Sequence, residues 1–174
     1  MFLLHSLQSP INVGMILRTA EVFEQSVVIL DAHGLMSDER LEVVADFACG
    51  ALGRRPPIVE TSLERCLERV GGRVILTGFD ANAIPLPQVD WKSGDCVVFG
   101  NEYDGLDKSG ISDAWATVWV PTTDQSLPKP SSINPIDPTR TEGVSHNGRA
   151  TLNVSAVAAI IGHSIFSARF PHFK

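Results

Sequence analysis

A short apolar run followed by polar residues is the stretch of the chain best suited to chemistry. Residues 97–99, VVF, have the length and β-branched character of a buried strand, and Gly100 then lets the backbone turn sharply. Asn101, Glu102 and Asp104 follow directly. Ligands of parallel sheets bind at the carboxyl ends of the strands. We therefore predict a ligand site here that uses carboxylate and amide groups.

Two further stretches carry polar side chains of the same kind. Asn12 is expected to cap a helix, and Arg18 lies on that helix away from its apolar face, where it can hold a phosphate or a ribose. Asn153 and Ser155 lie at the start of a later apolar helix. Each has an ordinary interpretation too: a surface arginine for Arg18, a solvated turn carboxylate for Glu102, and a helix cap for the last pair. Spacing alone leaves both interpretations open.

The elements that must position these residues alternate between strands and helices. This order predicts an α/β domain with a mainly parallel sheet. Residues 121–150 are rich in proline and poor in large apolar residues, so they are expected to form a long loop within a single domain of residues 1–174. The apolar patterns predict strands at 2–4, 26–30, 58–59, 74–77, 97–99 and 117–120, and helices at 12–23, 38–50, 61–70, 106–115 and 151–169.

Composition limits the class of protein. The chain has 174 residues, 44% hydrophobic and 20% charged, which suits one globular domain. A net charge of −6 means that any binding of nucleic acid would rest on a local basic patch.

Cys49, Cys66 and Cys96 have no CxxC spacing, which favours reduced, buried thiols in a cytoplasmic protein. The start of the chain lacks a basic region typical of a signal peptide, and the longest apolar run, 154–162, is too short to cross a membrane.

Several common sites are excluded by their missing motifs. The chain has no GxGxxG for a dinucleotide and no GxxxxGK[ST] for a phosphate-binding loop. Gly162-His163-Ser164 begins like a nucleophile elbow, but Phe166 stands where the second glycine is needed. The histidines have no metal-ligand spacing, so no metal is expected: His5, His33, His146, His163 and His172.

Taken together, three segments resemble the SpoU (TrmH) family of RNA ribose methyltransferases, in the knotted SPOUT class. Residues 12–20, NVGMILRTA, are similar to the motif N-x-G-x-x-x-R-x-A, and residues 99–106, FGNEYDGL, are similar to FGNEGxGL. Residues 151–156, TLNVSA, are similar to SLNVSxA. The motifs occur in the family's order, and the resemblance spans residues 2 to about 166 except for 121–150. It implies helices on both faces of the sheet and a C-terminal deep trefoil knot, a rare exception to the rule that chains do not thread loops.

The resemblance also implies an activity. The expected reaction is methyl transfer from S-adenosylmethionine to a ribose 2′-hydroxyl in RNA, without a metal. The single-domain form resembles short members that methylate the wobble nucleotide of tRNA, so tRNA is the expected substrate, and rRNA is the alternative. A cytoplasmic homodimer through the last helix is expected, which agrees with the nearly continuous apolar surface of residues 154–161.

Site residues follow from the same resemblance. Because the pKa of arginine exceeds 12, we expect Arg18 to position the hydroxyl and stabilise the developing alkoxide, with Glu102 orienting the arginine or the ribose. Asn12, Asn153 and Ser155 would hold the substrate and the first loop. The cofactor would contact backbone groups at Leu76, Gly100, Val120, Thr151 and Leu152. A local basic patch for RNA would come from Arg40, Arg54 and Arg55, completed by the partner subunit.

Two departures from the family pattern leave alternatives open. Tyr103 stands where the family has glycine, and it adds bulk or a ring on which a base can stack. The loop at 122–150 is longer than usual, and either closes over the cofactor or RNA through Lys129, Arg140 and Arg149, or is a disordered insertion. A protein that binds RNA or cofactor without catalysis is the rival interpretation. A SPOUT enzyme acting on a base nitrogen is disfavoured by the pairing of Arg18 with Glu102.

Overall fold

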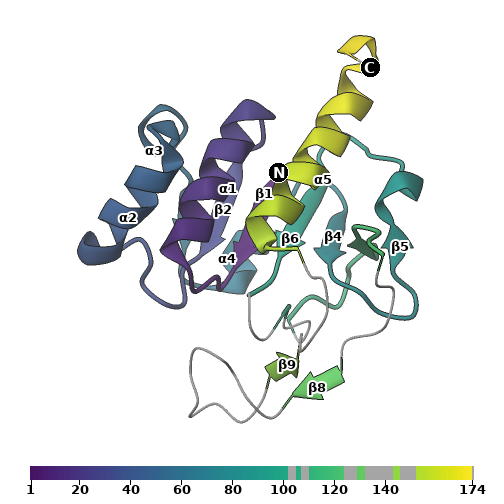
Figure 1. Cartoon of the computed structure of the whole chain (residues 1–174), viewed down its shortest axis with the longest axis horizontal. Coiled ribbons are helices and arrows are strands. Elements are labelled where there is room, and N and C mark those ends of the chain that lie inside the picture. The colour runs from purple at the N-terminus through teal and green to yellow at the C-terminus, as the bar shows by residue number, and fades with distance from the viewer. Residues whose placement is uncertain (102–104, 107–109, 124–128, 132–142, 146–151, 174) are drawn as a thin grey trace.

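The fold is built around a parallel sheet of seven strands in the order β3-β2-β1-β6-β4-β7-β5 (Figure 1). The computed structural model describes residues 1–101, 105–106, 110–123, 129–131, 143–145 and 152–173. Each pair of neighbouring strands in this sheet runs parallel, which confirms the prediction and gathers all carboxyl ends at one edge. The strands are β1 Phe2–His5, β2 Val27–Leu30, β3 Ile58–Glu60, β4 Val74–Thr77, β5 Ile84–Pro85, β6 Cys96–Phe99 and β7 Ala116–Trp119.

Helices cover both faces of the sheet, as predicted. Residues of α1, α2 and α5 share one hydrophobic core with the sheet, and residues of α4 belong to a second core on the other face. In Figure 1, α1 and α5 lie side by side in front of the sheet. The helices are α1 Pro10–Val22, α2 Asp38–Ala48, α3 Ala51–Arg54, α4 Leu63–Leu67 and α5 Val154–Arg169, with 3-10 turns η1 Leu86–Gln88 and η2 Pro171–Phe173.

The central strands are buried on both faces, and this explains their uninterrupted apolar sequences. Successive side chains of a strand point to opposite faces. Phe2 and Leu4 therefore enter the core beneath α1 and α5, whereas Leu3 enters the core beneath α4. Phe99 and Val98 divide between the two cores in the same way.

Two helix boundaries differ from the prediction. Helix α1 begins at Pro10, and the Ser9 hydroxyl accepts a hydrogen bond from the Asn12 amide at 3.3 Å. The prediction that Asn12 caps this helix was wrong, because the preceding Ser-Pro pair supplies both the cap and a first residue that needs no amide partner. The predicted helix at 38–50 ends at Ala48, since Cys49 adopts a left-handed conformation with φ 50°.

Other differences lie at shorter elements. Helix α4 is capped by Ser62 and ends at Leu67, so it is shorter than the predicted 61–70. The predicted helix at 106–115 was wrong for its described part, which forms turns whose residues Leu106, Ile111 and Ala114 pack into the second core. Strand β5 was missed, since its proline disfavours a strand except at a sheet edge, where β5 lies.

Residues 121–150 are partly described. A two-stranded antiparallel sheet of β8 Lys129–Ser131 and β9 Gly143–Ser145 occurs where a loop was predicted. Arg140 and Arg149 lie outside the described residues. The trefoil knot, the single-domain organisation and the role of this segment stay predictions.

Candidate functional site

The carboxyl edge of the sheet brings together segments that are far apart in the sequence. Strands β6, β4 and β7 are neighbours, and Leu76 in β4 pairs with Val98 of β6 and Thr117 of β7. Three of the positions predicted to bind the cofactor, Leu76, Gly100 and Val120, therefore lie on adjacent strands or directly after them. Thr151 lies outside the described residues, and Leu152 is exposed just before α5.

The turn after β6 is closed tightly upon itself. A Cβ on Gly100 would lie 2.6 Å from the Leu106 nitrogen and 2.7 Å from the Gly105 carbonyl, so only glycine fits. The Gly105 amide donates to the Asn101 carbonyl at 3.0 Å, and Gly105 has φ 73°. Glu102 and Tyr103 belong to this turn in the sequence and lie outside the described residues. The described residues at its two ends, Asn101 and Gly105, nevertheless show that the turn begins at the end of β6 and closes back beside it.

Asn101 joins this turn to the neighbouring strand. Its Nδ2 donates to the Ser6 carbonyl, directly after β1, at 3.2 Å. Ser6 has φ 56°, a left-handed conformation that is uncommon for serine. Sequence analysis placed Asn101 in the predicted ligand site but assigned it no particular contact. Its position between Gly100 and Glu102 was the available signal.

The amino ends of α1 and α5 lie next to each other at this edge. Asn12 and Ser155 are both buried, and the Ser155 hydroxyl approaches the Met15 sulfur at 3.8 Å. The Asn153 Oδ1 accepts from the Ser155 amide at 2.8 Å and from the Ser155 hydroxyl at 2.7 Å. The interpretation of Asn153 as a helix cap is thus confirmed. Since helix amino ends carry a partial positive charge, the arrangement favours anionic groups at this edge.

Arg18 lies apart from these residues within one chain. It lies six positions beyond Asn12 along α1, which is about 9 Å of helix. Its side chain is exposed, and Nη1 donates to the Cys49 sulfur at 3.4 Å. Exposed apolar residues share its face of α1 at helical spacing: Ile11, Met15 and Val22.

The cysteines follow the prediction in part. All three are free thiols. Burial raises the pKa of Cys66 to about 11 and the pKa of Cys96 to about 12. Cys49 is exposed, so the prediction of burial was wrong there, because the residue sits at the corner where α2 ends.

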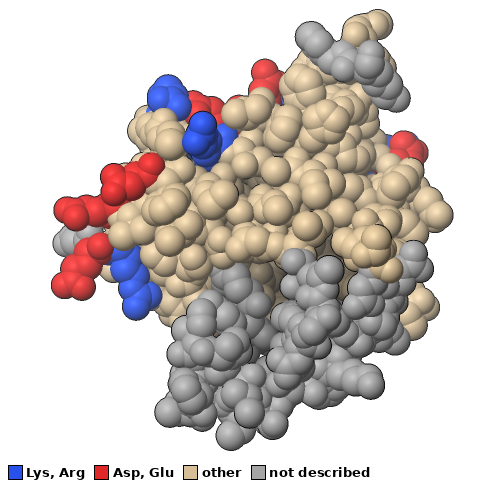
Figure 2. Space-filling view, viewed as in Figure 1, with Lys and Arg blue, Asp and Glu red and all other residues tan. Residues whose placement is uncertain are grey.

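The arginines proposed for RNA binding do not form one patch. Arg40 donates to the His33 carbonyl at 3.1 Å near the start of α2, whereas Arg54 and Arg55 follow its end. Arg54 is paired with Glu21 through two bonds of 2.6 and 2.8 Å, which raise the pKa of Arg54 and lower that of Glu21. The surface of α2 between them carries exposed carboxylates, shown in red at the left of Figure 2: Glu39, Glu42 and Asp46.

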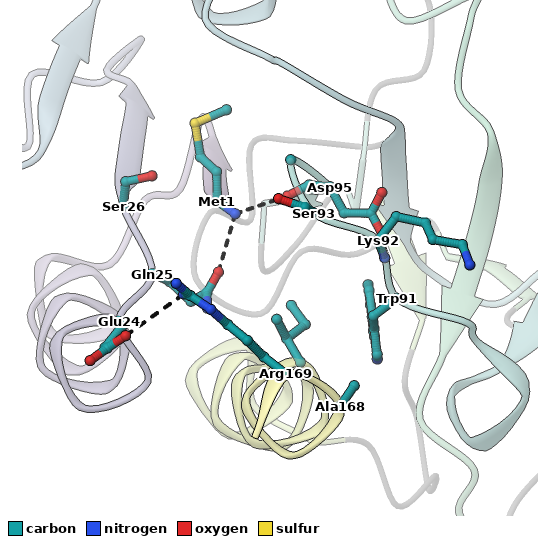
Figure 3. A pocket seen from close by; sticks show the side chains of 12 residues that line it. Met1, Glu24, Gln25, Ser26, Trp91, Lys92, Ser93, Asp95, Ala168 and Arg169 are labelled. Atoms are coloured by element: carbon teal, nitrogen blue, oxygen red, sulfur yellow. Dashed lines mark hydrogen bonds and ion pairs between the residues drawn. The ribbon is translucent and has the colours of Figure 1, made fainter. Parts of the chain in front are cut away.

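A pocket lies at the opposite edge, where β2 and β6 begin, and Figure 3 shows the side chains that line it. Its volume is about 330 Å³. The Met1 nitrogen donates to the Gln25 Oε1 at 3.1 Å and to the Asp95 carbonyl at 2.9 Å, and Arg169 faces Glu24 at 3.7 Å. These polar groups pair with one another, and none of the predicted site residues lines the pocket. The candidate site is therefore the carboxyl edge, where the predicted catalytic and cofactor-binding residues that the structure describes lie, except Arg18.

The described part of the chain contains neither a cluster of metal ligands nor a membrane-spanning helix. No group of three or more histidine, cysteine or acidic side chains is placed to hold a metal ion there. Nor does any helix among the described residues have the length and apolar character needed to cross a membrane.

Comparison with solved structures identifies the fold. The chain aligns with a structure described as "Structural insights into the 2-OH methylation of C/U34 on tRNA" at 17% identity and TM-score 0.70, covering 98% of this chain and 95% of the other. The A. aeolicus TrmH/SpoU tRNA modifying enzyme aligns at 16% identity and TM-score 0.72, over 99% and 76%. The SpoU methyltransferase AviRb from Streptomyces viridochromogenes, in complex with AdoMet, aligns at 19% identity and TM-score 0.70, over 98% of this chain and 60% of AviRb. At these identities the similarity shows the fold.

Comparison at the level of sequence gives the family. Among curated proteins, none matches this chain. The model of the SpoU rRNA Methylase family matches residues 1–134, a range that includes the first two motifs and the strands whose carboxyl ends they follow. This match covers most of the chain, and the fold of the solved SpoU and TrmH enzymes agrees with it, so the chain belongs to the SpoU rRNA Methylase family.

Proposed function

We propose that this protein transfers a methyl group from S-adenosylmethionine to a ribose 2′-hydroxyl of RNA. The observation that carries the proposal is the convergence of the three motifs, through Asn12, Gly100 and Ser155, on one edge of the sheet. We propose tRNA as the substrate, with the wobble nucleotide as the target. The neighbour concerned with 2-OH methylation of C/U34 on tRNA supports this choice, since it matches this chain over nearly its whole length.

The groups at the edge suit a nucleoside cofactor. Adenine is recognised largely by backbone groups and apolar contact, and pockets for such ligands are mostly apolar with few polar groups. Backbone after β4, β6 and β7 and the exposed side chain of Leu152 offer this combination, with Thr151 next to it in the sequence. The AdoMet complex of AviRb supports the same cofactor. When bound, S-adenosylmethionine supplies the electrophilic methyl group.

The protein's own residues would position the hydroxyl. A guanidinium with a pKa above 12 is a poor base, so Arg18 holds the 2′-oxygen and stabilises the negative charge that develops on it. Asn153 uses Oδ1 for its helix cap, which leaves its amide nitrogen to donate to a ribose or phosphate oxygen. Asn12 and Ser155 hold the first turns of α1 and α5 in place relative to each other. Glu102 orients the arginine or the ribose.

We propose that the protein acts as a homodimer through α5 and the neighbouring face of α1. Figure 2 shows a largely uncharged surface over these helices, and Ile11, Met15, Val22 and Ile160 are exposed on them. Because Arg18 lies on the same face of α1, dimerisation would place it at the boundary between subunits, where it could face the carboxyl edge of the partner subunit. The free cysteines suit a cytoplasmic location.

The test is transfer of labelled methyl to unmodified tRNA and, separately, to rRNA, followed by digestion to nucleosides. A 2′-O-methyl nucleoside from tRNA is expected, and the Arg18→Ala variant should lose transfer while it still binds S-adenosylmethionine. A methylated base would overturn the reaction class. Cofactor binding without transfer to either RNA would favour the non-catalytic binding protein that Tyr103 suggests. Labelling of rRNA alone would overturn the choice of tRNA.

A further inference from the structure

The corner between α2 and α3 contacts Arg18. Two residues in succession, Cys49 with φ 50° and Gly50 with φ 84°, have left-handed conformations, and they end α2 and start α3 at Ala51. This corner lies against α1, and the Cys49 sulfur accepts a hydrogen bond from the Arg18 Nη1 at 3.4 Å. A non-glycine residue in a left-handed conformation is uncommon, so the thiol is held where a glycine would be easier to accommodate.

An ion pair anchors the corner to the same helix. Arg54 makes two bonds to the carboxylate of Glu21, at 2.6 and 2.8 Å, and its Nη2 also donates to the Cys49 carbonyl at 3.3 Å. Glu21 lies three residues beyond Arg18 on α1 and hence one turn along the helix. A Cβ on Gly50 would lie 2.5 Å from the Arg54 Nη1, so glycine gives the guanidinium its space. These contacts hold the backbone of Cys49 in place and thereby limit where its thiol can lie.

We propose that this corner positions Arg18 for methyl transfer, through the thiol of Cys49 and the ion pair between Arg54 and Glu21. The inference rests on the proposed function of Arg18. An exposed arginine has many rotamers, and a hydrogen bond to the thiol favours one of them. A carboxylate would neutralise the guanidinium, whereas a neutral thiol leaves its charge and its other N–H groups for an oxygen of RNA. Among the described residues, Arg18 forms no ion pair.

The positioning role assigns Arg54 a different task from RNA contact. Its Nε and Nη2 already donate to the Glu21 carboxylate, and Nη2 also donates to the Cys49 carbonyl. An arginine held in this way fixes a backbone segment and has few donors left for a phosphate.

The experiment compares kcat and KM for methyl transfer to tRNA among variants of the corner. Cys49→Ala removes the acceptor and should lower kcat about tenfold, because small misplacement of a catalytic group has large effects on rate. Cys49→Ser keeps an acceptor and should restore kcat to within about threefold. Glu21→Gln should lower kcat by a smaller factor than Cys49→Ala. KM for S-adenosylmethionine should stay unchanged in all of them, and Glu42→Gln, an exposed carboxylate of α2, is the matched control.

Two further variants separate the possible failures. If Arg18→Ala retains full transfer, the proposed function of Arg18 is wrong, and so is this inference. If Arg18→Ala is inactive but Cys49→Ala and Glu21→Gln keep the wild-type kcat, the inference alone is overturned. Cys49→Gly relaxes the left-handed backbone without supplying an acceptor, so it should be at least as stable as the wild type and still slow. Normal kcat in this variant would overturn the positioning role, since a purely structural contribution of Cys49 would predict that result.

Discussion

Gly100→Ala tests whether the turn after β6 is part of the site. The added Cβ would lie 2.6 Å from the Leu106 nitrogen and 2.7 Å from the carbonyl carbon and oxygen of Gly105. All three are backbone atoms, so no side-chain rotation relieves the contact. Ordinary contact for a Cβ begins at 3.4 Å, and the turn must therefore move by roughly 0.8 Å.

The expected result is a large loss of rate with a moderate loss of stability. A displacement near 1 Å of catalytic groups costs about a hundredfold in rate, and overpacking costs about 1–3 kcal/mol of unfolding free energy. The assays are single-turnover methyl transfer to tRNA and urea denaturation. Gly105→Ala is the matched control, since its Cβ would meet nothing within 4 Å and only its φ of 73° is unfavourable. It should lose about 1 kcal/mol of stability and less of the rate than Gly100→Ala.

A Gly100→Ala variant with wild-type turnover and cofactor affinity would refute the reasoning. Equal losses of rate in both glycine variants would also count against it, because the turn would then respond to backbone strain and not to displacement.

Three further predictions concern stability and reactivity. Gly14→Ala should lower the unfolding free energy by about 1–2 kcal/mol, because its Cβ would lie 2.6 Å from the Val44 carbonyl oxygen on α2; Gly53→Ala, which meets nothing within 4 Å, is the control. Asn153→Ala should cost about 0.5–2 kcal/mol through loss of the α5 cap, measured by urea denaturation at neutral pH. The folded-state pKa of Cys96, raised to about 12, means that the unfolded thiol ionises first; the contribution of this thiol to stability should be constant below about pH 8 and be lost as pH rises from about 9 to 12, and Cys96→Ala should flatten this fall.

The parallel sheet was predictable from sequence because burial on both faces leaves a clear signal. Continuous apolar runs such as 97–99 and 27–29 occur only where neither face meets water. The position of the second motif at the end of β6 followed from the same signal, whereas the first and third motifs lie at the starts of α1 and α5. The order of the strands across the sheet could not be predicted from sequence, because the pairing of β6 between β1 and β4 depends on contacts between residues far apart in the chain.

Local backbone chemistry explains most of the wrong boundaries. Asn12 and Ser9 are both good caps, and the choice between them was decided by Pro10, whose ring suits the first turn of a helix. The end of α2 at Cys49 was not predictable, because cysteine has no preference for the left-handed conformation that it adopts there. Two side-chain contacts, from Asn101 to Ser6 at the candidate site and from Arg18 to Cys49 outside it, join distant segments and likewise have no signal in spacing.

The distribution of charge limits how RNA can approach an acidic protein. The exposed carboxylates of α2 repel a phosphate backbone, and the surface over α1 and α5 is largely uncharged. The carboxyl edge differs from both, because the amino ends of α1 and α5 meet there and present amides with partial positive charge. Attraction at that edge is short-ranged and acts only within a turn of the helix ends. In the proposed dimer, affinity for RNA would come from contacts at the site itself and from the second subunit, because a dimer through the neutral face leaves both edges open to supply them.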